Sequence, residues 1–195
     1  MIVKRIAPLS AETWPDLEDL FGPNGACAGC WCMWWRAGKG LYRAGQGNRD
    51  ALRALLDTEV SVGLLAYAGD PDADEERAVG WCAVAPRSSY SQLAKTAVGR
   101  GGRDEAGRWA VTCFFVRRGH RRRGVTDHLL AAACDHGRAH GAGVIEGYPV
   151  TAQKASSADL FVGTKSLFAR HGFVVVREPT ARRAVMERTF AADNA

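Results

Sequence analysis

The sequence has no long hydrophobic run, and no window approaches the ~20 consecutive apolar residues that a membrane span requires. Its start, MIVKRIAPLSAETW, lacks the apolar stretch after positive charges that is typical of an export signal. We therefore expect a cytoplasmic protein that makes no use of a membrane. In that compartment its six cysteines should be reduced thiols, which argues against a disulfide framework.

The sequence also lacks internal repeats, low-complexity tracts and the length for two typical domains. With 195 residues, of which 47% are hydrophobic, it can bury one sizeable core, so we expect a single domain over residues 1–195. The net charge of +5 is modest. Much of it lies in residues 117–123, where a multiply anionic small molecule can neutralise it without any nucleic acid.

The most informative segment is CFFVRRGHRRRGVTDHLL, residues 113–130. It contains an apolar run rich in β-formers, an arginine-dense loop, one glycine and an amphipathic helix. Gly124 lets the backbone pass close to an anion, and the free N–H groups of the following helix point at the same place. The countercharge comes from Arg117, Arg118, Arg121, Arg122 and Arg123. This order predicts a phosphate-binding turn.

The turn Arg121-x-x-Gly124-x-Thr126, together with FARHGF around residue 172, resembles the GNAT superfamily of acyl-CoA-dependent N-acyltransferases. The family turn, Gln/Arg-x-x-Gly-x-Gly/Ala, cradles the pyrophosphate of coenzyme A. Thr126 departs from the small last residue, which implies a slightly altered pocket. The resemblance covers residues 60–190 and implies that acetyl-CoA is the acyl donor. The residues expected to bind it in and near the turn are Arg121, Arg122, Arg123, Gly124, Val125, Thr126 and Thr164.

The expected elements follow the order of the GNAT fold, an α/β (α+β) fold. Apolar periodicity and turn residues predict strands and helices. The strands are 2–6, 64–67, 79–85, 109–116, 143–150, 173–177 and 184–188. The helices are one ending at Phe21 and capped by Ser10 or Thr13, one capped by Asn48, one at 90–97, one at 124–140 and one ending at Gly172. The loops include the acidic tip at 70–76.

The resemblance implies a mixed, mostly antiparallel seven-stranded sheet, flanked by helices, whose fourth and fifth strands run parallel and splay apart. Pantetheine would lie in this splay and pair with strand backbone like an added β-strand. Phe114, Phe115 and Val116 would supply those backbone groups. Residues 1–60 would then form an N-terminal cap over the acceptor site, and residues 61–190 the acyl-CoA-binding core.

Acetyl transfer needs a neutral amine, and an alkylammonium of pKa about 10.4 is neutral in only ~1 part in 2,500 at pH 7. Glu146 is the only carboxylate inside a predicted central strand, so it is the candidate proton acceptor. The other interpretation is a structural pair with an arginine. Many GNAT enzymes use a tyrosine as the general acid, and this sequence has Phe168 at that position. Tyr148 shares a strand face with Glu146 and is the favoured replacement among the nearby hydroxyls, with Ser166 and Thr164 as alternatives.

The unusual segment ACAGCWCMWWR, residues 26–36, combines thiols and tryptophans. Zinc on Cys27, Cys30 and Cys32 is one hypothesis, but a structural site needs four ligands and no second Cys/His pair is suitably placed, so we expect no metal. In the fold that the chain resembles, this region overhangs the acceptor. The expected substrate-binding residues are Trp31, Trp34, Trp35, Cys30 and Cys32, with core packing as the alternative.

The sequence thus favours an acetyl-CoA-dependent N-acetyltransferase acting on a small-molecule or peptide amine, as a monomer or homodimer. A second hypothesis is a non-catalytic acyl-CoA sensor of the same fold, which the missing tyrosine makes plausible. A third, a cysteine-rich nucleic-acid binder, does not explain the strand–turn–helix context. The acceptor itself cannot be read from variable loops, and fold does not fix function.

Overall fold

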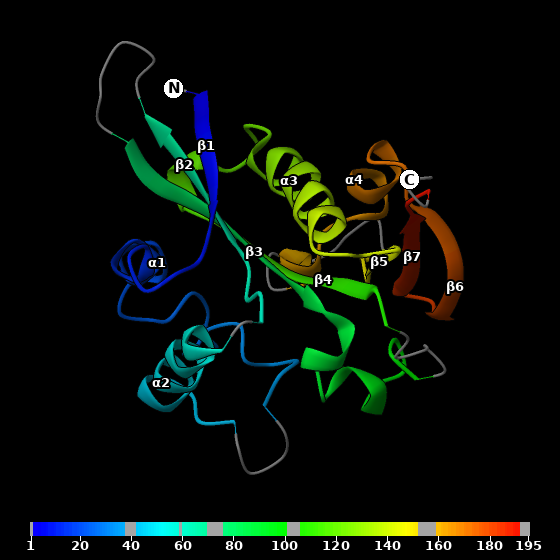
Figure 1. Ribbon diagram of the computed structural model, residues 1–195, viewed down its shortest axis with the longest axis horizontal. Helices are drawn as coiled ribbons and strands as arrows, with labels where there is room; N and C mark the ends of the chain where they lie inside the picture. Colours follow the sequence, from blue (N-terminus) through cyan, green and yellow to red (C-terminus); the bar gives the residue numbers. More distant parts are fainter. Residues whose placement is uncertain are drawn as a thin grey trace.

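Seven strands form one mixed sheet in the computed structural model, which describes residues 2–37, 42–58, 60–69, 76–100, 106–151 and 159–191. The strands are β1 (Ile2–Pro8), β2 (Leu64–Gly69), β3 (Glu76–Pro86), β4 (Arg108–Val116), β5 (Val144–Gly147), β6 (Val174–Thr180) and β7 (Arg183–Thr189). Their order in the sheet is β1-β2-β3-β4-β5-β7-β6 (Figure 1). Only β4 and β5 pair in parallel, which confirms the predicted mixed, mostly antiparallel sheet.

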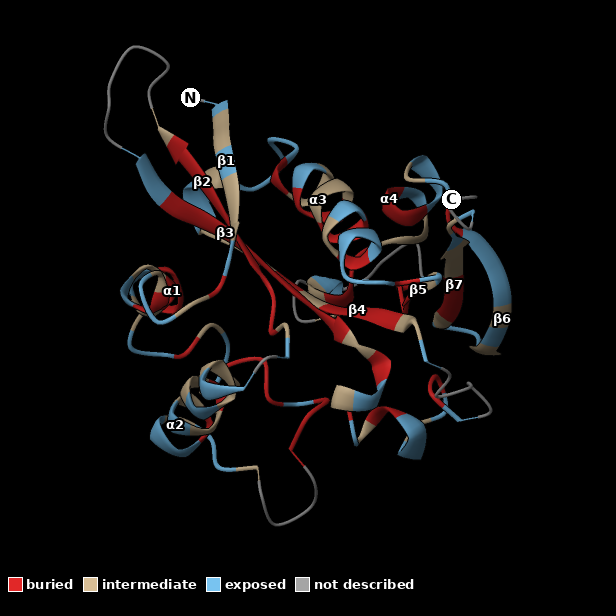
Figure 2. Ribbon diagram, viewed as in Figure 1, coloured by how far each residue is buried: buried red, intermediate tan, exposed pale blue. Residues whose placement is uncertain are grey.

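Helices cover both faces of the sheet. The helices α1 (Trp14–Phe21) and α2 (Gln46–Ala54) lie on one face, and α3 (Val125–Ala139) and α4 (Lys165–Arg170) lie on the other (Figure 1). Apolar side chains fill the space between these layers, so the central strands are buried while β6 at the sheet edge is largely exposed (Figure 2). None of the helices in the described ranges is long and apolar enough to cross a membrane.

The parallel pairing of β4 with β5 covers only the first part of β4. It begins at Arg108 and Val144 and ends at Val111 and Gly147. The rest of β4 pairs with β3 on its other side, up to Val116 opposite Gly80. Within the described residues no strand lies beside Phe114–Val116 on the β5 side, so the two strands part as expected.

A β-bulge in β4 marks the point where the strands separate. The register with β3 shifts so that Val111 faces Val84 and Cys113 faces Ala83, which leaves Thr112 as the extra residue. Side-chain direction changes there: Val111 and then Phe114 pack in the core beneath α3, while Cys113 packs on the opposite face beside α1. A regular strand would place Val111 and Cys113 on the same face, and the bulge instead places them on opposite faces.

Asn48 is not the helix cap that the sequence suggested. Gly45 is the N-cap of α2, and Asn48 lies inside the first turn, fully buried. Its amide donates to the carbonyl oxygens of Gly29 and Cys30 at 3.0 and 3.2 Å, and its Oδ1 accepts from the N–H of Arg43 at 2.8 Å. Asn48 thus fixes the segment that precedes the tryptophans, because a buried amide needs partners and the irregular backbone supplies them.

Other boundaries differ from expectation in small ways. The helix predicted at 90–97 is a single 3-10 turn, Leu93–Lys95, and another 3-10 turn, Arg87–Ser89, precedes this range. Strand β5 ends at Gly147 rather than Val150, because Pro149 cannot donate to the ladder. Val60 lies beyond the end of α2 and is exposed. The acidic tip expected at 70–76 lies largely outside the described residues.

Gly147 is expected to be essential for packing at the end of β5. A Cβ there would lie 2.1 and 2.4 Å from two ring carbons of the buried Phe168. Gly147→Ala should therefore lower the free energy of unfolding by about 1–3 kcal/mol. Gly143→Ala is the matched control, since its added methyl meets open space. Denaturant titration of both variants checks this. Equal stability of the two would show that the Phe168 ring can move aside without lowering the free energy of unfolding.

Candidate functional site

The second half of β4 presents a backbone edge between two packed faces. Phe114 packs against Phe168 at a ring-centroid distance of 6.2 Å, and Phe115 packs edge-on against Phe21 of α1 at 5.4 Å. Val116 is half-buried. These contacts fix the side chains on both faces, while no strand of the described residues pairs with Phe114–Val116 on the β5 side.

The turn that follows β4 has the conformation that an anion site requires. Gly124, the N-cap of α3, has φ +77° in the left-handed region, and Arg122 also has a positive φ of +59°. No side chain of the described residues caps α3. The N–H groups of Val125 and Thr126, at its start, have no partner within the helix and lie at the positive end of its dipole.

Four exposed arginines surround the turn: Arg118, Arg121, Arg122 and Arg123. None of them has a carboxylate partner within the described ranges. Arg121 instead donates to the carbonyl oxygen of Val116 at 3.0 Å, which joins the turn to the end of β4. The one carboxylate in the first turn of α3, Asp127, is held by Arg170 at 2.8 Å and so is paired away from the helix terminus. The positive charge of these arginines should therefore attract a phosphate group to the turn.

Thr164 has a structural task in this arrangement. Its hydroxyl accepts from the N–H of Leu167 at 3.2 Å and caps α4, as a threonine before a helix is expected to do. The backbone of Thr164 pairs with that of Val150 in an isolated parallel bridge near the gap between β4 and β5. Its contact with the coenzyme stays a prediction.

Glu146 lies in a buried ionic cluster. Its Oε1 accepts from Nε of Arg87 at 2.5 Å and from the hydroxyl of Tyr148, and its Oε2 lies 3.5 Å from Nη1 of Arg108. Arg108 also pairs with Glu187 of β7 at 2.6 Å. The arginine partner left unnamed at the sequence level is thus Arg87, which follows β3 and is only 2% exposed. Because Oε1 already has two donors, a proton that binds this oxygen would come through one of them.

Tyr148 is the donor that can pass on a proton. It is almost fully buried and bonds Glu146 from the same face of the strand, as the alternation predicted. Burial and the Glu146 carboxylate raise the pKa of the Tyr148 hydroxyl well above its usual range. The phenol therefore keeps its proton at neutral pH and can donate it when Glu146 accepts.

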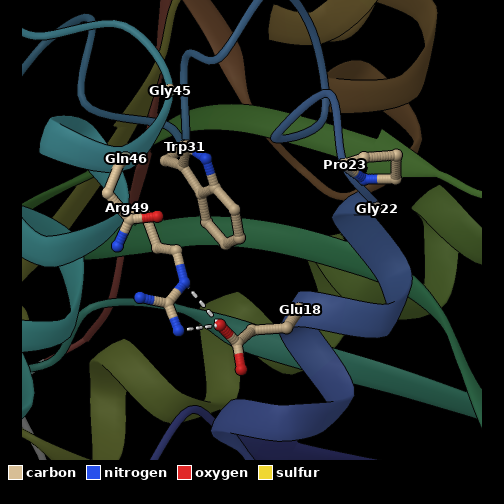
Figure 3. A pocket seen from close by; sticks show the side chains of 7 residues that line it. All are labelled: Glu18, Gly22, Pro23, Trp31, Gly45, Gln46 and Arg49. Carbon is tan, nitrogen blue, oxygen red and sulfur yellow. Dashed lines mark hydrogen bonds and ion pairs between the residues drawn. The ribbon is translucent and has the colours of Figure 1, made fainter.

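The three tryptophans of the cap segment lie in three separate environments and do not form one wall. Trp31 stacks on Trp14 at 5.9 Å and lines a cavity of about 250 Å³ between α1 and α2, where Arg49 bonds Glu18 (Figure 3). Trp34 is 57% exposed, and its ring meets that of Tyr42 edge-on. Trp35 is buried with its ring 6.4 Å from that of Tyr148. Of the three, Trp35 therefore lies closest to Glu146 and Tyr148.

The three cap cysteines also diverge. Cys27 is exposed, Cys30 is half-buried near Tyr42, and Cys32 is buried with its sulfur against Trp81 and Cys113. Burial raises the pKa of the Cys30 thiol. Across the described residues no three His, Cys, Asp or Glu side chains are grouped as metal ligands would be. Cys32 points into the core, so its expected contact with a substrate has no support in this geometry.

Two buried polar atoms near the gap lack a partner within the described part of the chain. They are Oγ1 of Thr112, at the bulge, and Nε1 of Trp35. Thr112 is 1% exposed and Trp35 is 9% exposed. A buried donor without a partner is costly, and it marks a place where a polar ligand group would be stabilised.

Comparison with known proteins agrees with this geometry. A sequence model described as the acetyltransferase (GNAT) family matches residues 48–162. The chain belongs to the GNAT acetyltransferase family. The match includes the open edge of β4, the turn and α3, and it also spans Glu146 and Tyr148. No curated relative matches the chain in sequence.

Solved structures share the GNAT fold at low sequence identity. PaiA N-acetyltransferase from Thermoplasma acidophilum, in complex with coenzyme A, has 14% identity and a TM-score of 0.55, over 97% of this chain and 100% of that one. A GCN5-related N-acetyltransferase from Kribbella flavida has 18% identity and a TM-score of 0.55, over 95% and 97%. A ribosomal-protein-alanine N-acetyltransferase from Brucella melitensis has 13% identity and a TM-score of 0.54, over 95% and 99%. The acetyl-CoA expected from the sequence agrees with family and fold.

Sequence reasoning missed Arg87, Thr112 and Cys113 in this GNAT site. One feature of the sequence could have indicated Arg87: it is a charged residue that directly follows the apolar run AVGWCAVAP, at the end of a strand. Thr112 and Cys113 had none, because a bulge depends on the register with β3. Trp35 was named, but only as one of three equivalent tryptophans.

The Arg87–Glu146 pair should be costly to break. Arg87→Gln would leave Glu146 buried and undercompensated, so the free energy of unfolding should fall by about 3–5 kcal/mol. Arg170→Gln breaks the half-exposed pair with Asp127 and should cost only about 0–1 kcal/mol. Urea unfolding of both variants provides the comparison. A small effect of Arg87→Gln would mean that Arg108 alone can hold Glu146.

Proposed function

We propose that this GNAT-family chain transfers the acetyl group of acetyl-CoA to a primary amine of a small molecule or peptide. One observation carries the proposal: the unpaired edge of β4 leads directly into an uncapped helix N-terminus ringed by arginines. An extended thioester ligand with a pyrophosphate at one end matches that sequence of features. The buried Glu146–Tyr148 pair lies at the other end of the gap.

The turn from Arg121 to Thr126 would bind the pyrophosphate of the coenzyme. The positive φ of Gly124 opens the backbone, and no Cβ fills the space above it. Arg122 and Arg123 add charge without a competing carboxylate, and Arg121 is tied to Val116. Pantetheine would then follow Phe114–Val116 towards the bulge, where the thioester would meet the acceptor.

The proton of the attacking amine would leave through Tyr148 to Glu146. The amine nitrogen forms a bond to the acetyl carbon, and its proton passes to the Tyr148 oxygen as Tyr148 gives its own proton to Glu146. The sulfur of coenzyme A departs as a thiolate, which is a tolerable leaving group without the tyrosine that Phe168 replaces. Glu146 thus remains the proposed proton acceptor, acting through Tyr148 because the Tyr148 hydroxyl already donates to its Oε1.

Trp35 and Thr112 would orient the groups that react. The unpartnered indole N–H of Trp35 belongs to a ring beside Tyr148, and Thr112 stands at the bulge, directly after the last residue of β4 that pairs with β5. A carbonyl oxygen of the acetyl group or of a peptide acceptor would satisfy them. Trp31 and Trp34 would play no part in this step, because one stacks on Trp14 and the other faces solvent.

Acetyl-CoA binding should depend on Gly124. Gly124→Asp places a carboxylate at the phosphate turn, and like charges ~4 Å apart cost about 4 kcal/mol at a protein surface, which corresponds to a ~10³-fold weaker affinity. Gly141→Asp is the matched control, because Gly141 also has a positive φ, +82° against +77°, with open space above it at the far end of α3. Isothermal calorimetry should find the control unchanged. Unchanged affinity in a folded Gly124→Asp protein would refute the turn assignment.

Glu146→Gln should lose ~10²–10⁴ in kcat/KM at pH 7, the usual worth of a general base. The loss should shrink as rising pH deprotonates the amine, whose pKa is about 10.4. Tyr148→Phe should lose a similar factor in kcat/KM if the proton passes through Tyr148 to Glu146. Tyr67→Phe is the control: its hydroxyl donates to Asp16 of α1 at 2.7 Å, and Tyr67 packs in a different cluster from Tyr148. Rates are measured per folded molecule with an amine panel.

Three outcomes separate the alternatives. Full activity of a destabilised Glu146→Gln protein would make Glu146 purely an ion-pair residue. Activity lost in Glu146→Gln but kept in Tyr148→Phe would remove Tyr148 from the route. Tight acetyl-CoA binding without turnover of any amine in the unaltered chain would favour the sensor function over the transferase.

A further inference from the structure

Two thiols from distant parts of the chain meet beside the open half of β4. Sγ of Cys32, which lies between Trp31 and Trp34 in the sequence, is 3.2 Å from Sγ of Cys113, 81 residues later. Cys32 is the donor of this contact. A disulfide bond is about 2.05 Å long, so the two sulfurs need to approach by only ~1.2 Å to bond.

The cap holds Cys32 firmly in this position. Nε1 of Trp81 donates to its sulfur at 3.1 Å, and Asn48 ties the backbone of the neighbouring Cys30. Trp31 and Cys32 both have positive φ values, +45° and +54°, a conformation that non-glycine residues adopt only when the surroundings impose it. The fold therefore brings the two thiols together at some cost in backbone conformation.

We propose that Cys32 and Cys113 are a disulfide-forming pair that links the cap to β4 when a low-molecular-weight disulfide is present. The Cys113 thiolate attacks the reagent and releases one thiolate, which gives a mixed disulfide on Cys113. The Cys32 sulfur then attacks Cys113, and the second thiol leaves with the Cys32 proton. The protein loses two hydrogen atoms in all, and the reagent is reduced to two thiols.

Accessibility and acidity set the order of these steps. Cys113 is half-buried on β4, whereas Cys32 is buried. The hydrogen bond to Cys113 and burial raise the pKa of the Cys32 thiol, so it is not the sulfur that reacts first.

The bond would act on the proposed site, and this consequence alone rests on the proposed function. Cys113 lies one residue before Phe114–Val116, the backbone proposed to hold pantetheine. Pulling it ~1 Å towards the cap would misplace the thioester, and an error of that size can cost ~10²-fold in rate. Oxidation should therefore slow transfer at least tenfold, and dithiothreitol should restore it.

The direct test treats the full chain with oxidised glutathione, blocks free thiols and maps peptides without reduction. The expected product joins Cys32 to Cys113, with a higher unfolding temperature than the reduced protein because the bond restrains the unfolded chain. Cys113→Ala should abolish the linked peptide. Cys27→Ser, at an exposed thiol with no role in the pair, should keep it.

The competing pair is Cys27 with Cys30, which form a C-x-x-C motif in the same segment. A Cys27–Cys30 bridge, a stable glutathione adduct on Cys113, or no bridge in the folded unaltered chain would each overturn the proposal. If Cys113→Ala does not fold, Cys32→Ala is the second variant. A mapped Cys32–Cys113 bridge that leaves turnover unchanged would refute the regulatory effect but leave the site itself standing, and peptide mapping needs no acceptor amine.

Discussion

The parallel pairing of β4 with β5 covers four residue pairs and stops at Val111 and Gly147, and the site depends on that early end. Three local features impose it. Thr112 bulges from β4, Pro149 lacks the N–H that would extend β5, and the ring of Phe168 occupies the space next to Gly147. With its ladder interrupted, the second half of β4 retains an unpaired edge in the middle of a sheet, where a ligand backbone can complete it.

The buried ionic cluster supports the sheet at the base of this gap. Glu146 of β5 joins Arg87, which follows β3, and Arg108 at the start of β4, while Arg108 also binds Glu187 of β7. Four neighbouring segments are thus cross-linked below the point where β4 and β5 separate. Because a buried charge network is satisfied only in one arrangement, it favours the splayed geometry over a slipped register.

Local sequence signals predicted the parts of the fold that are themselves local. The strand, turn and helix from Trp109 to Ala139 were found because apolar runs, Gly124 and the arginines are contiguous. The face shared by Glu146 and Tyr148 followed from strand alternation, and the structure joins them by a hydrogen bond. Identification of the fold rested on resemblance as well as on these patterns.

Features set by contacts between distant segments could not be predicted. The role of Asn48 depends on the carbonyls of a loop about 20 residues earlier, so a capping signal was the natural but wrong interpretation. The bulge at Thr112 exists only against β3, and the Cys32–Cys113 contact only once the cap has packed. The separation of Trp31, Trp34 and Trp35 follows from positive φ values that composition does not reveal.

We propose that acetyl-CoA completes the open edge of β4 and is anchored at the start of α3. Hydrogen–deuterium exchange, with and without acetyl-CoA, is the sharpest test because amides in a new backbone ladder exchange more slowly. Protection is expected in peptides covering residues 114–116 and 121–126, and none in β6 or at the 250 Å³ cavity beside Trp31. Protection at that cavity without any change along β4 would refute this binding mode.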